Sequence, residues 1–211
     1  MKSDKEITNL IDKGKIRIDP FFPKFLGPNL YYCHLGQNFL IPKKMKGEFN
    51  PLRDDSGKFF KKLHTNKPIS LKPGQFILAE TFEFLGTDDS HIIKLFNSSS
   101  FARCGIFQAA LGMLNPGCGK ETPVKITLEL YNSFSVPVIL TPTTVNNEGE
   151  ISWGTEVLKV GVEKMDSKPT NSYSNWKFAA YGKDQKVMSS RMNNRFGSDK
   201  DIVINKEKYT T

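Results

Sequence analysis

The side chains that could support metal chemistry are few and stand apart in the sequence. The three histidines, His34, His64 and His91, are followed by Leu-Gly, Thr-Asn and Ile-Ile, and the three cysteines include no Cys-x-x-Cys pair. A deaminase that uses zinc needs a His-x-Glu and a Pro-Cys-x-x-Cys sequence, because the bound metal must activate the attacking water. Neither is present, and G-x-x-x-x-G-K-[ST] and G-x-S-x-G are absent as well. We therefore expect no zinc and no metal held by protein ligands alone.

Glu129 is a carboxylate placed where it could transfer protons. Residues 124–131 alternate apolar and other side chains, which predicts a half-buried strand with Glu129 beside Thr127 on its non-apolar face. A carboxylate in an enclosed site can have a raised pKa, which suits acid–base catalysis near neutral pH. A surface glutamate on a half-exposed strand fits the same pattern, so the spacing alone leaves both interpretations open.

Short strands and turns must position these residues. Residues 3–14 form the only well-marked helix, with a capping box between Ser3 and Glu6 and a glycine at its end. Prolines and glycines then divide short β-rich runs, and Pro73-Gly74 suits a type II turn. This pattern predicts a barrel or a jelly-roll-like sandwich. The further candidate strands are 76–79, 91–96, 136–141 and 156–163.

Composition narrows the class of protein. The chain has 211 residues, 38% of them hydrophobic, and a formal net charge of +8. No apolar run approaches the roughly 20 residues of a membrane helix, and the first residues lack the apolar segment of a signal peptide. The odd cysteine count suggests no disulfide framework, so we expect a cytoplasmic protein without a membrane partner. The lysines are mostly scattered, which favours a solvated surface over nucleic-acid binding, although Lys43–Lys62 keeps that alternative open.

Residues 97–132 contain the most specific pattern. N-S-S-S-F-A-R-C-G is followed by N-P-G and then by I-T-L-E-L-Y-N. This order resembles the dCTP deaminase branch of the trimeric dUTPase-like family, which carries R-S-S-L-A-R-L-G, I-D-P-G and I-x-L-E-x-x-N. The segments S-D-K-E-I-T-N-L-I-D-K-G-K-I-R-I-D-P-F, L-K-P-G-Q-F-I-L-A-E-T and Y-G-K-D-Q-K-V-M-S-S-R also resemble family sequences. The match covers most of residues 3–192.

The resemblance implies a fold and an assembly. We expect a mostly β, dUTPase-like distorted jelly roll or β-barrel with a short N-terminal helix, assembled as a homotrimer. Residues 1–192 would form one domain with a polar insertion at about 43–67, and 193–211 a charged C-terminal tail.

The resemblance also implies a reaction and a site. Glu129 would deprotonate a water that adds to C4 of a cytosine deoxynucleotide, dCTP by default, to give dUTP and ammonia in the metabolism that supplies dUMP. Ser99 and Arg103 would assist, and the site would form between neighbouring subunits. Mg²⁺ would bind through the nucleotide phosphates. The implied substrate-binding residues are Ser98, Ser100, Asn115, Thr127, Leu128, Tyr173, Asp184 and Gln185.

Several positions depart from the family pattern. Ser98 stands where the family has an arginine that holds the triphosphate, and a hydroxyl cannot replace the charge-assisted bonds of a guanidinium. Ala180 replaces a phosphate-binding lysine, and Asp184 replaces a glutamine, although Gln185 is adjacent. Asn115 replaces an aspartate, and about four residues are added between it and the catalytic strand.

These departures leave alternatives. Other lysines, such as Lys94, Lys120 or Lys183, could bind the phosphates instead. The chain could also be a catalytically weak or inactive nucleotide-binding or regulatory protein on the same fold. A dUTP pyrophosphatase is less attractive, because that reaction relies on an aspartate that activates water, and Asn115 cannot act as a general base.

Overall fold

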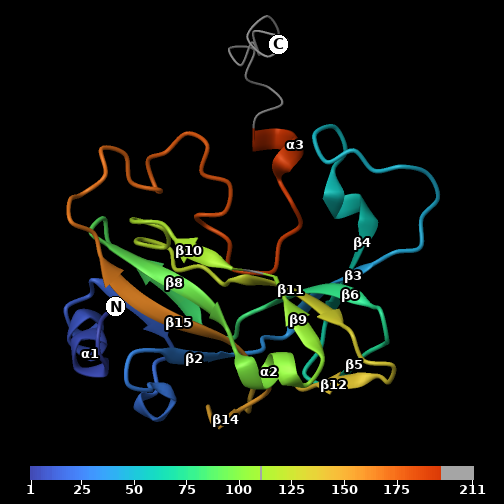
Figure 1. The fold of residues 1–211 in the computed structure, drawn as a ribbon, viewed down its shortest axis with the longest axis horizontal. Coiled ribbons are helices and arrows are strands. Elements are labelled where there is room, and N and C mark those ends of the chain that lie inside the picture. The colour runs from blue at the N-terminus through green and yellow to red at the C-terminus, as the bar shows by residue number, and fades with distance from the viewer. Residues whose placement is uncertain (110, 196–211) are drawn as a thin grey trace, which may run out of the picture.

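The computed structural model describes residues 1–109 and 111–195, which form a mostly β fold with few helices (Figure 1). The predicted mostly β class is therefore confirmed. Of the charged tail predicted at 193–211, residues 196–211 lie outside the described residues. Within the described ranges, no helix is both long enough and apolar enough to cross a bilayer.

The first element is the short helix α1 (Asp4–Asp12), which falls within the predicted 3–14 span. The Ser3 hydroxyl accepts a hydrogen bond from the N–H of Glu6, and the Glu6 carboxylate accepts one from the N–H of Ser3. The predicted capping box is thus present, and it satisfies two backbone donors at the start of the helix. The helix packs onto the core through Ile7, which is fully buried.

Two antiparallel sheets make up most of the fold. The four-stranded sheet has the order β10 (Gly112–Leu114), β8 (His91–Asn97), β15 (Glu156–Lys164) and β2 (Tyr31–His34). The five-stranded sheet has the order β4 (Phe60–His64), β3 (Asn38–Pro42), β6 (Phe76–Glu80), β11 (Thr127–Asn132) and β9 (Ile106–Gln108).

Smaller elements complete the fold. Two-stranded pairs join β1 (Ile16–Asp19) with β7 (Phe84–Thr87), β5 (Ile69–Leu71) with β12 (Val138–Leu140), and β13 (Thr144–Val145) with β14 (Ile151–Ser152). The short helices are η1 (Pro23–Phe25), η2 (Ser56–Phe59), α2 (Ser99–Arg103) and α3 (Met192–Arg195).

Strand β11 shows how the alternating sequence produces the core. Leu128 and Leu130 are fully buried, whereas Thr127, Glu129 and Tyr131 lie on the opposite face. The alternation of 124–131 predicted these two faces correctly, because successive strand side chains point to opposite sides of a sheet. The ladder starts only at Thr127, because the backbone of residue 124 forms an isolated bridge with β7 instead.

The segment predicted as an insertion forms a long connection followed by an edge strand. Residues 43–59 leave β3 and return through η2, and β4 then pairs with β3 from Asn38 opposite His64 to Pro42 opposite Phe60. Strand β4 is the edge of its sheet. Two of its five residues, Lys61 and Lys62, are exposed lysines, and charged edge residues of this kind discourage pairing with another sheet.

Candidate active site

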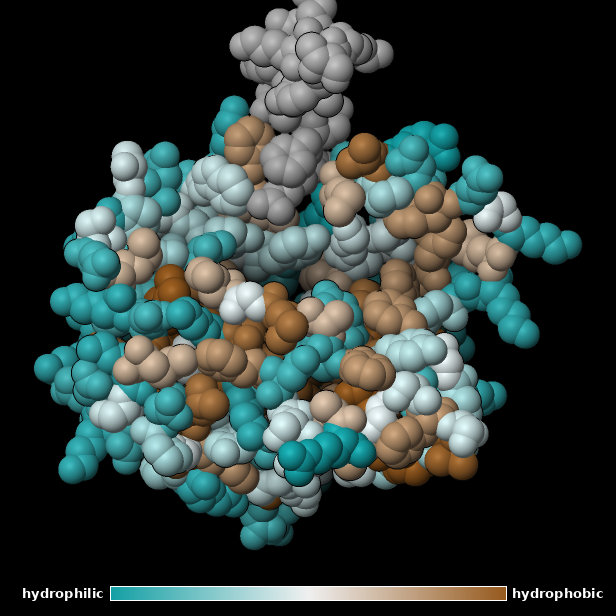
Figure 2. Space-filling view, in the orientation of Figure 1, coloured by the Kyte–Doolittle hydropathy of each residue, from teal (hydrophilic) through white to brown (hydrophobic). Residues whose placement is uncertain are grey.

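A cavity of about 590 Å³ opens on the outer face of the five-stranded sheet, and we call it the Glu129 cavity. Its floor includes Glu129 and Thr127 from β11 and Leu78 from β6. Figure 2, in the orientation of Figure 1, shows apolar side chains interspersed with polar ones across the middle of the molecule. Most of the residues that line the cavity are apolar, and a few polar side chains, Glu129 among them, stand between them.

Glu129 lies at the polar centre of this cavity. It sits opposite Leu78 in the β11–β6 ladder and is half-buried. In the part of the chain that the structure describes, no side chain forms a hydrogen bond or ion pair with its carboxylate. Burial raises the pKa of Glu129 above its ordinary value, because removal from water disfavours the charged form. An unpaired carboxylate with a raised pKa is well suited to take up and return a proton.

Four of the predicted substrate-binding residues line the same cavity. They are Asn115, Thr127, Tyr173 and Asp184. The Tyr173 N–H donates to the carbonyl of Pro116 at 2.8 Å, and its hydroxyl accepts the N–H of Tyr181 at 3.2 Å, which holds the ring beside the cavity. One oxygen of Asp184 accepts a hydrogen bond from Arg191 at 2.7 Å. Its other oxygen is buried and has no hydrogen-bond partner among the described residues.

The remaining predicted residues do not reach this cavity. Helix α2 carries Ser99, Ser100 and Arg103 on the protein surface, in the lower part of the view in Figure 1. Ser98 is 1% exposed, and its hydroxyl donates to Glu156 at 2.6 Å, so it is already engaged in a buried contact. The side chain of Leu128 is part of the core. Gln185 is exposed and is not among the lining residues.

The structure adds cavity walls that the sequence did not predict. Phe49, Ser56 and Phe60 bring the 43–60 segment to the cavity, opposite the C-terminal residues 188–190. The Ser56 hydroxyl donates to the carbonyl of Ser190 at 2.8 Å, which joins the two walls. No local signal marks these residues, because the contact spans 134 positions in the sequence.

A buried carboxylate beneath the cavity holds the C-terminal segment to the sheet. Glu80 is fully buried, and its Oε1 accepts hydrogen bonds from Asn38 at 2.7 Å and from Lys125 at 3.0 Å. Its Oε2 accepts the N–H of Val187 at 2.8 Å. On β11, the Thr127 hydroxyl accepts the N–H of the next residue, 188, at 3.1 Å. The position of Lys125 on the non-apolar face of 124–131 was the only sequence signal for this cluster.

Three aromatic side chains form an exposed row beside the cavity. Phe76, Tyr131 and Phe107 lie directly opposite one another across β6, β11 and β9. They are 37%, 42% and 62% exposed, respectively. A contiguous aromatic row of this kind on a sheet face is typical of an interaction surface.

Comparison with known proteins gives a consistent picture. The family model of dCTP deaminase-like proteins matches residues 1–145. A protein of Nanoarchaeum equitans named "dCTP deaminase, dUMP-forming" is 31% identical over 157 residues, which cover 66% of this chain and 77% of that protein. A protein of Dictyoglomus thermophilum with the same name is 28% identical over 198 residues, which cover 90% of this chain and 94% of that protein.

A solved structure supports the fold. The crystal structure of 2'-deoxycytidine 5'-triphosphate deaminase from Agrobacterium tumefaciens superimposes with a TM-score of 0.54 at 15% identity. The match covers 81% of this chain and 49% of that one, so this chain spans about half of its length. The predicted family resemblance is confirmed, and the chain belongs to the dCTP deaminase-like family.

Proposed function

We propose that this protein deaminates dCTP to dUTP and ammonia in the Glu129 cavity. The observation that carries the proposal is the unpaired, half-buried carboxylate of Glu129, whose pKa is raised by burial. Relatives named as dCTP deaminases support the choice of substrate.

In the proposed reaction, the Glu129 carboxylate accepts a proton from water while the water oxygen adds to C4 of the cytosine ring. Protonated Glu129 then gives this proton to the 4-amino group, and the C4–N bond breaks to release ammonia. The second proton of the water leaves the oxygen as the C4 carbonyl of uracil forms and ends on N3, which carries a hydrogen in uracil but not in cytosine, so one water is consumed for each ammonia released. The raised pKa of Glu129 suits both steps, because the group is a stronger base than an exposed glutamate and its acid form remains accessible.

The second part of the site would come from a neighbouring subunit of a homotrimer. Arg103 and Ser99 are exposed and lie away from the cavity of their own subunit, so they are free to complete the cavity of another. The aromatic row of Phe76, Tyr131 and Phe107 would be covered in such an assembly. A guanidinium from the neighbour would stabilise negative charge that develops near the reacting ring.

Magnesium would enter with the nucleotide. In the described part of the chain, no group of three or more His, Cys, Asp or Glu side chains could hold a metal ion by itself. This fits Mg²⁺ that takes its ligands mainly from substrate phosphates and water. The ion would neutralise phosphate charge.

We place the reaction in the cytoplasm. Cys33, Cys104 and Cys118 are free thiols, and free thiols remain reduced in that compartment.

We further propose that the reaction of this chain stops at dUTP, which differs from the dUMP-forming reaction for which both relatives are named. Release of dUMP would also require water to attack a phosphate, and Asn115 cannot deprotonate that water. The test is to incubate the full chain with dCTP and Mg²⁺ and to separate the nucleotides by anion-exchange chromatography. The proposal predicts dUTP and ammonia in equal amounts. Accumulation of dUMP with diphosphate would contradict the proposed product, and saturable dCTP binding without turnover would support the nucleotide-binding alternative.

A further inference from the structure

A second pocket adjoins the Glu129 cavity on the other side of Tyr173. Its volume is about 390 Å³, and Tyr173 is the residue that lines both spaces. The chain at 180–183 passes close to this ring, because a Cβ on Gly182 would lie 3.1 Å from the Tyr173 ring carbons. We call this space the Lys183 pocket.

The Lys183 pocket is basic. Three cations line it, namely Lys120, Lys183 and Arg191, against the single acidic side chain of Glu121. The Arg191 guanidinium is held by the carbonyl of residue 180 and by Asp184, so its orientation is fixed before any ligand binds.

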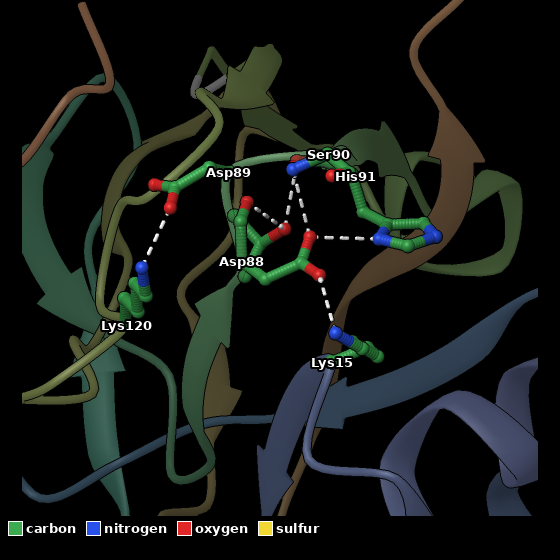
Figure 3. A network of polar contacts seen from close by, with 7 residues as sticks. Lys15, Asp88, Asp89, Ser90, His91 and Lys120 are labelled. Carbon is green, nitrogen blue, oxygen red and sulfur yellow. Dashed lines mark hydrogen bonds and ion pairs between the residues drawn. The ribbon is translucent and has the colours of Figure 1, made fainter. Parts of the chain in front are cut away.

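The two lysines differ in how they are held. Lys120 forms an ion pair with Asp89 at 2.6 Å (Figure 3). Lys183 is exposed and has no hydrogen bond or ion pair with any described residue, so its charge is available to a ligand. Lys120 also lies in the stretch after Asn115 that is longer than in the family pattern, which means that the added residues help to form this pocket.

Backbone geometry shapes the same wall. Gly117 and Gly119 have φ values of +81° and +67°. A Cβ on Gly117 would lie 2.8 Å from Asp89 Oδ1, and one on Gly119 would lie 2.5 Å from the carbonyl oxygen of Leu85. Both positions therefore require glycine, and Lys120 and Glu121 follow them at the pocket.

Resting on the proposed function, we propose that the Lys183 pocket binds the polyphosphate of the nucleotide while the cytosine ring occupies the Glu129 cavity. Tyr173 would then lie between base and phosphates, where the sugar must pass. Lys183 and Arg191 would contact the phosphates directly, and Lys120 would add charge from the opposite wall. Ser98 cannot take this role in its own subunit, because it is buried against Glu156.

Binding measurements on full-length variants test this assignment. Isothermal titration with dCTP, deoxycytidine and inorganic tripolyphosphate would compare the wild type with Lys183→Gln and Lys120→Gln. The matched control is Lys94→Gln. The sequence made Lys94 a candidate phosphate ligand, but in the structure it is ion-paired with Glu163 on the four-stranded sheet and lines neither space. Removing one phosphate-binding cation should weaken dCTP binding by about tenfold for Lys183→Gln, and somewhat less for Lys120→Gln.

The ligand series separates the two proposals. We expect Lys183→Gln to weaken the binding of dCTP and of tripolyphosphate and to leave the binding of deoxycytidine unchanged. Lys94→Gln should bind all three ligands as the wild type does. Equal dCTP affinity in the wild type and Lys183→Gln, or no binding of dCTP and tripolyphosphate at all, would overturn the pocket assignment. If binding depends on Lys183 but no ammonia is released, the pocket assignment holds and the proposed deamination fails. If ammonia is released from dCTP and the lysine variants behave like the wild type, the deamination holds and the pocket assignment fails.

Discussion

The buried carboxylate of Glu80 accepts the backbone N–H of Val187 at 2.8 Å, across 107 positions of the sequence. This bond joins the centre of the five-stranded sheet to the segment that forms one wall of the Glu129 cavity. The same carboxylate pairs with Lys125, whose side chain is 12% exposed. Glu80 therefore couples the stability of the sheet to the position of the C-terminal wall.

Glu80→Gln should destabilise the protein and release the C-terminal wall. The change leaves the charge of Lys125 unpaired in a largely buried position, and breaking a buried pair in this way costs about 3 kcal/mol in the free energy of unfolding. Urea titration measures the loss, and hydrogen exchange at the Val187 amide should accelerate by more than the global loss explains. Glu163→Gln, which breaks an exposed pair with Lys94, is the control and should change little. Unchanged protection at Val187 in Glu80→Gln would contradict the coupling.

A second carboxylate, Asp88 on the turn between β7 and β8, should make the stability of the protein depend on pH. Asp88 accepts hydrogen bonds from the His91 ring and from the N–H of Ser90, and Lys15 lies 3.7 Å from it (Figure 3). Burial alone would raise the pKa of Asp88, but these hydrogen bonds and charges outweigh it and lower the pKa below the ordinary 3.8. A lowered pKa in the folded state stabilises the protein above pH 3.8, and this contribution is lost as the pH falls through the folded value.

Asp88→Asn should therefore lower the free energy of unfolding by about 1 kcal/mol at pH 7. The difference from the wild type should shrink to nothing as the pH falls below 3.8. Chemical denaturation at a series of pH values checks this, with Asp166→Asn, which changes an exposed aspartate, as the control. A difference that stays constant with pH would show that the charge of Asp88 is not the cause.

The effect of Glu129 on the pH dependence of stability should have the opposite sign to that of Asp88. Because its folded pKa is raised by burial, the protonated form is the one that stabilises the fold. The contribution of this group to stability is fully present below pH 4.5, the ordinary pKa of a glutamate. It is lost as the pH rises through the higher pKa of the folded state. Glu129→Gln should match the wild type near pH 4.5 and be more stable than it at pH 7 to 8. Thermal denaturation of both proteins across this pH range measures the difference. A Glu129→Gln variant less stable than the wild type at pH 8 would contradict a pKa raised by burial.

Subunit mixing tests the shared site. Arg103→Gln and Glu129→Gln should each be inactive alone, but a mixed trimer can pair an intact Glu129 with an intact Arg103 from its neighbour. Random mixing in equal amounts should restore about a quarter of the wild-type activity. Unmixed proteins assayed at the same concentrations are the control. A mixture that exchanges subunits and remains inactive would show that both residues must come from one chain.

The sequence predicted those features of the fold that depend on local pattern. Apolar alternation identified β11 and its buried face, the capping box located α1, and 156–163 anticipated β15. The family motif identified Glu129, which lies in the largest of the cavities described above. These features are readable because each depends on neighbouring residues.

The rest of the site depends on contacts between distant residues. The hydrogen bonds from Val187 to Glu80 and from Ser56 to Ser190 have no signature in the sequence around either partner. The motif also could not show that helix α2 lies away from the cavity of its own subunit, since that follows from the path between β8 and β9.

The most direct test of the central claim is ammonia release from dCTP by the wild type and by Glu129→Gln. Glu148→Gln is the matched control, because Glu148 is exposed on the connection between β13 and β14. General acid–base catalysis contributes on the order of 100-fold to 10,000-fold, so Glu129→Gln should lose at least about 100-fold in kcat with dCTP still bound. The wild type and Glu148→Gln should turn over equally. Comparable turnover by Glu129→Gln, or none by the wild type assembled as a trimer, would contradict the account.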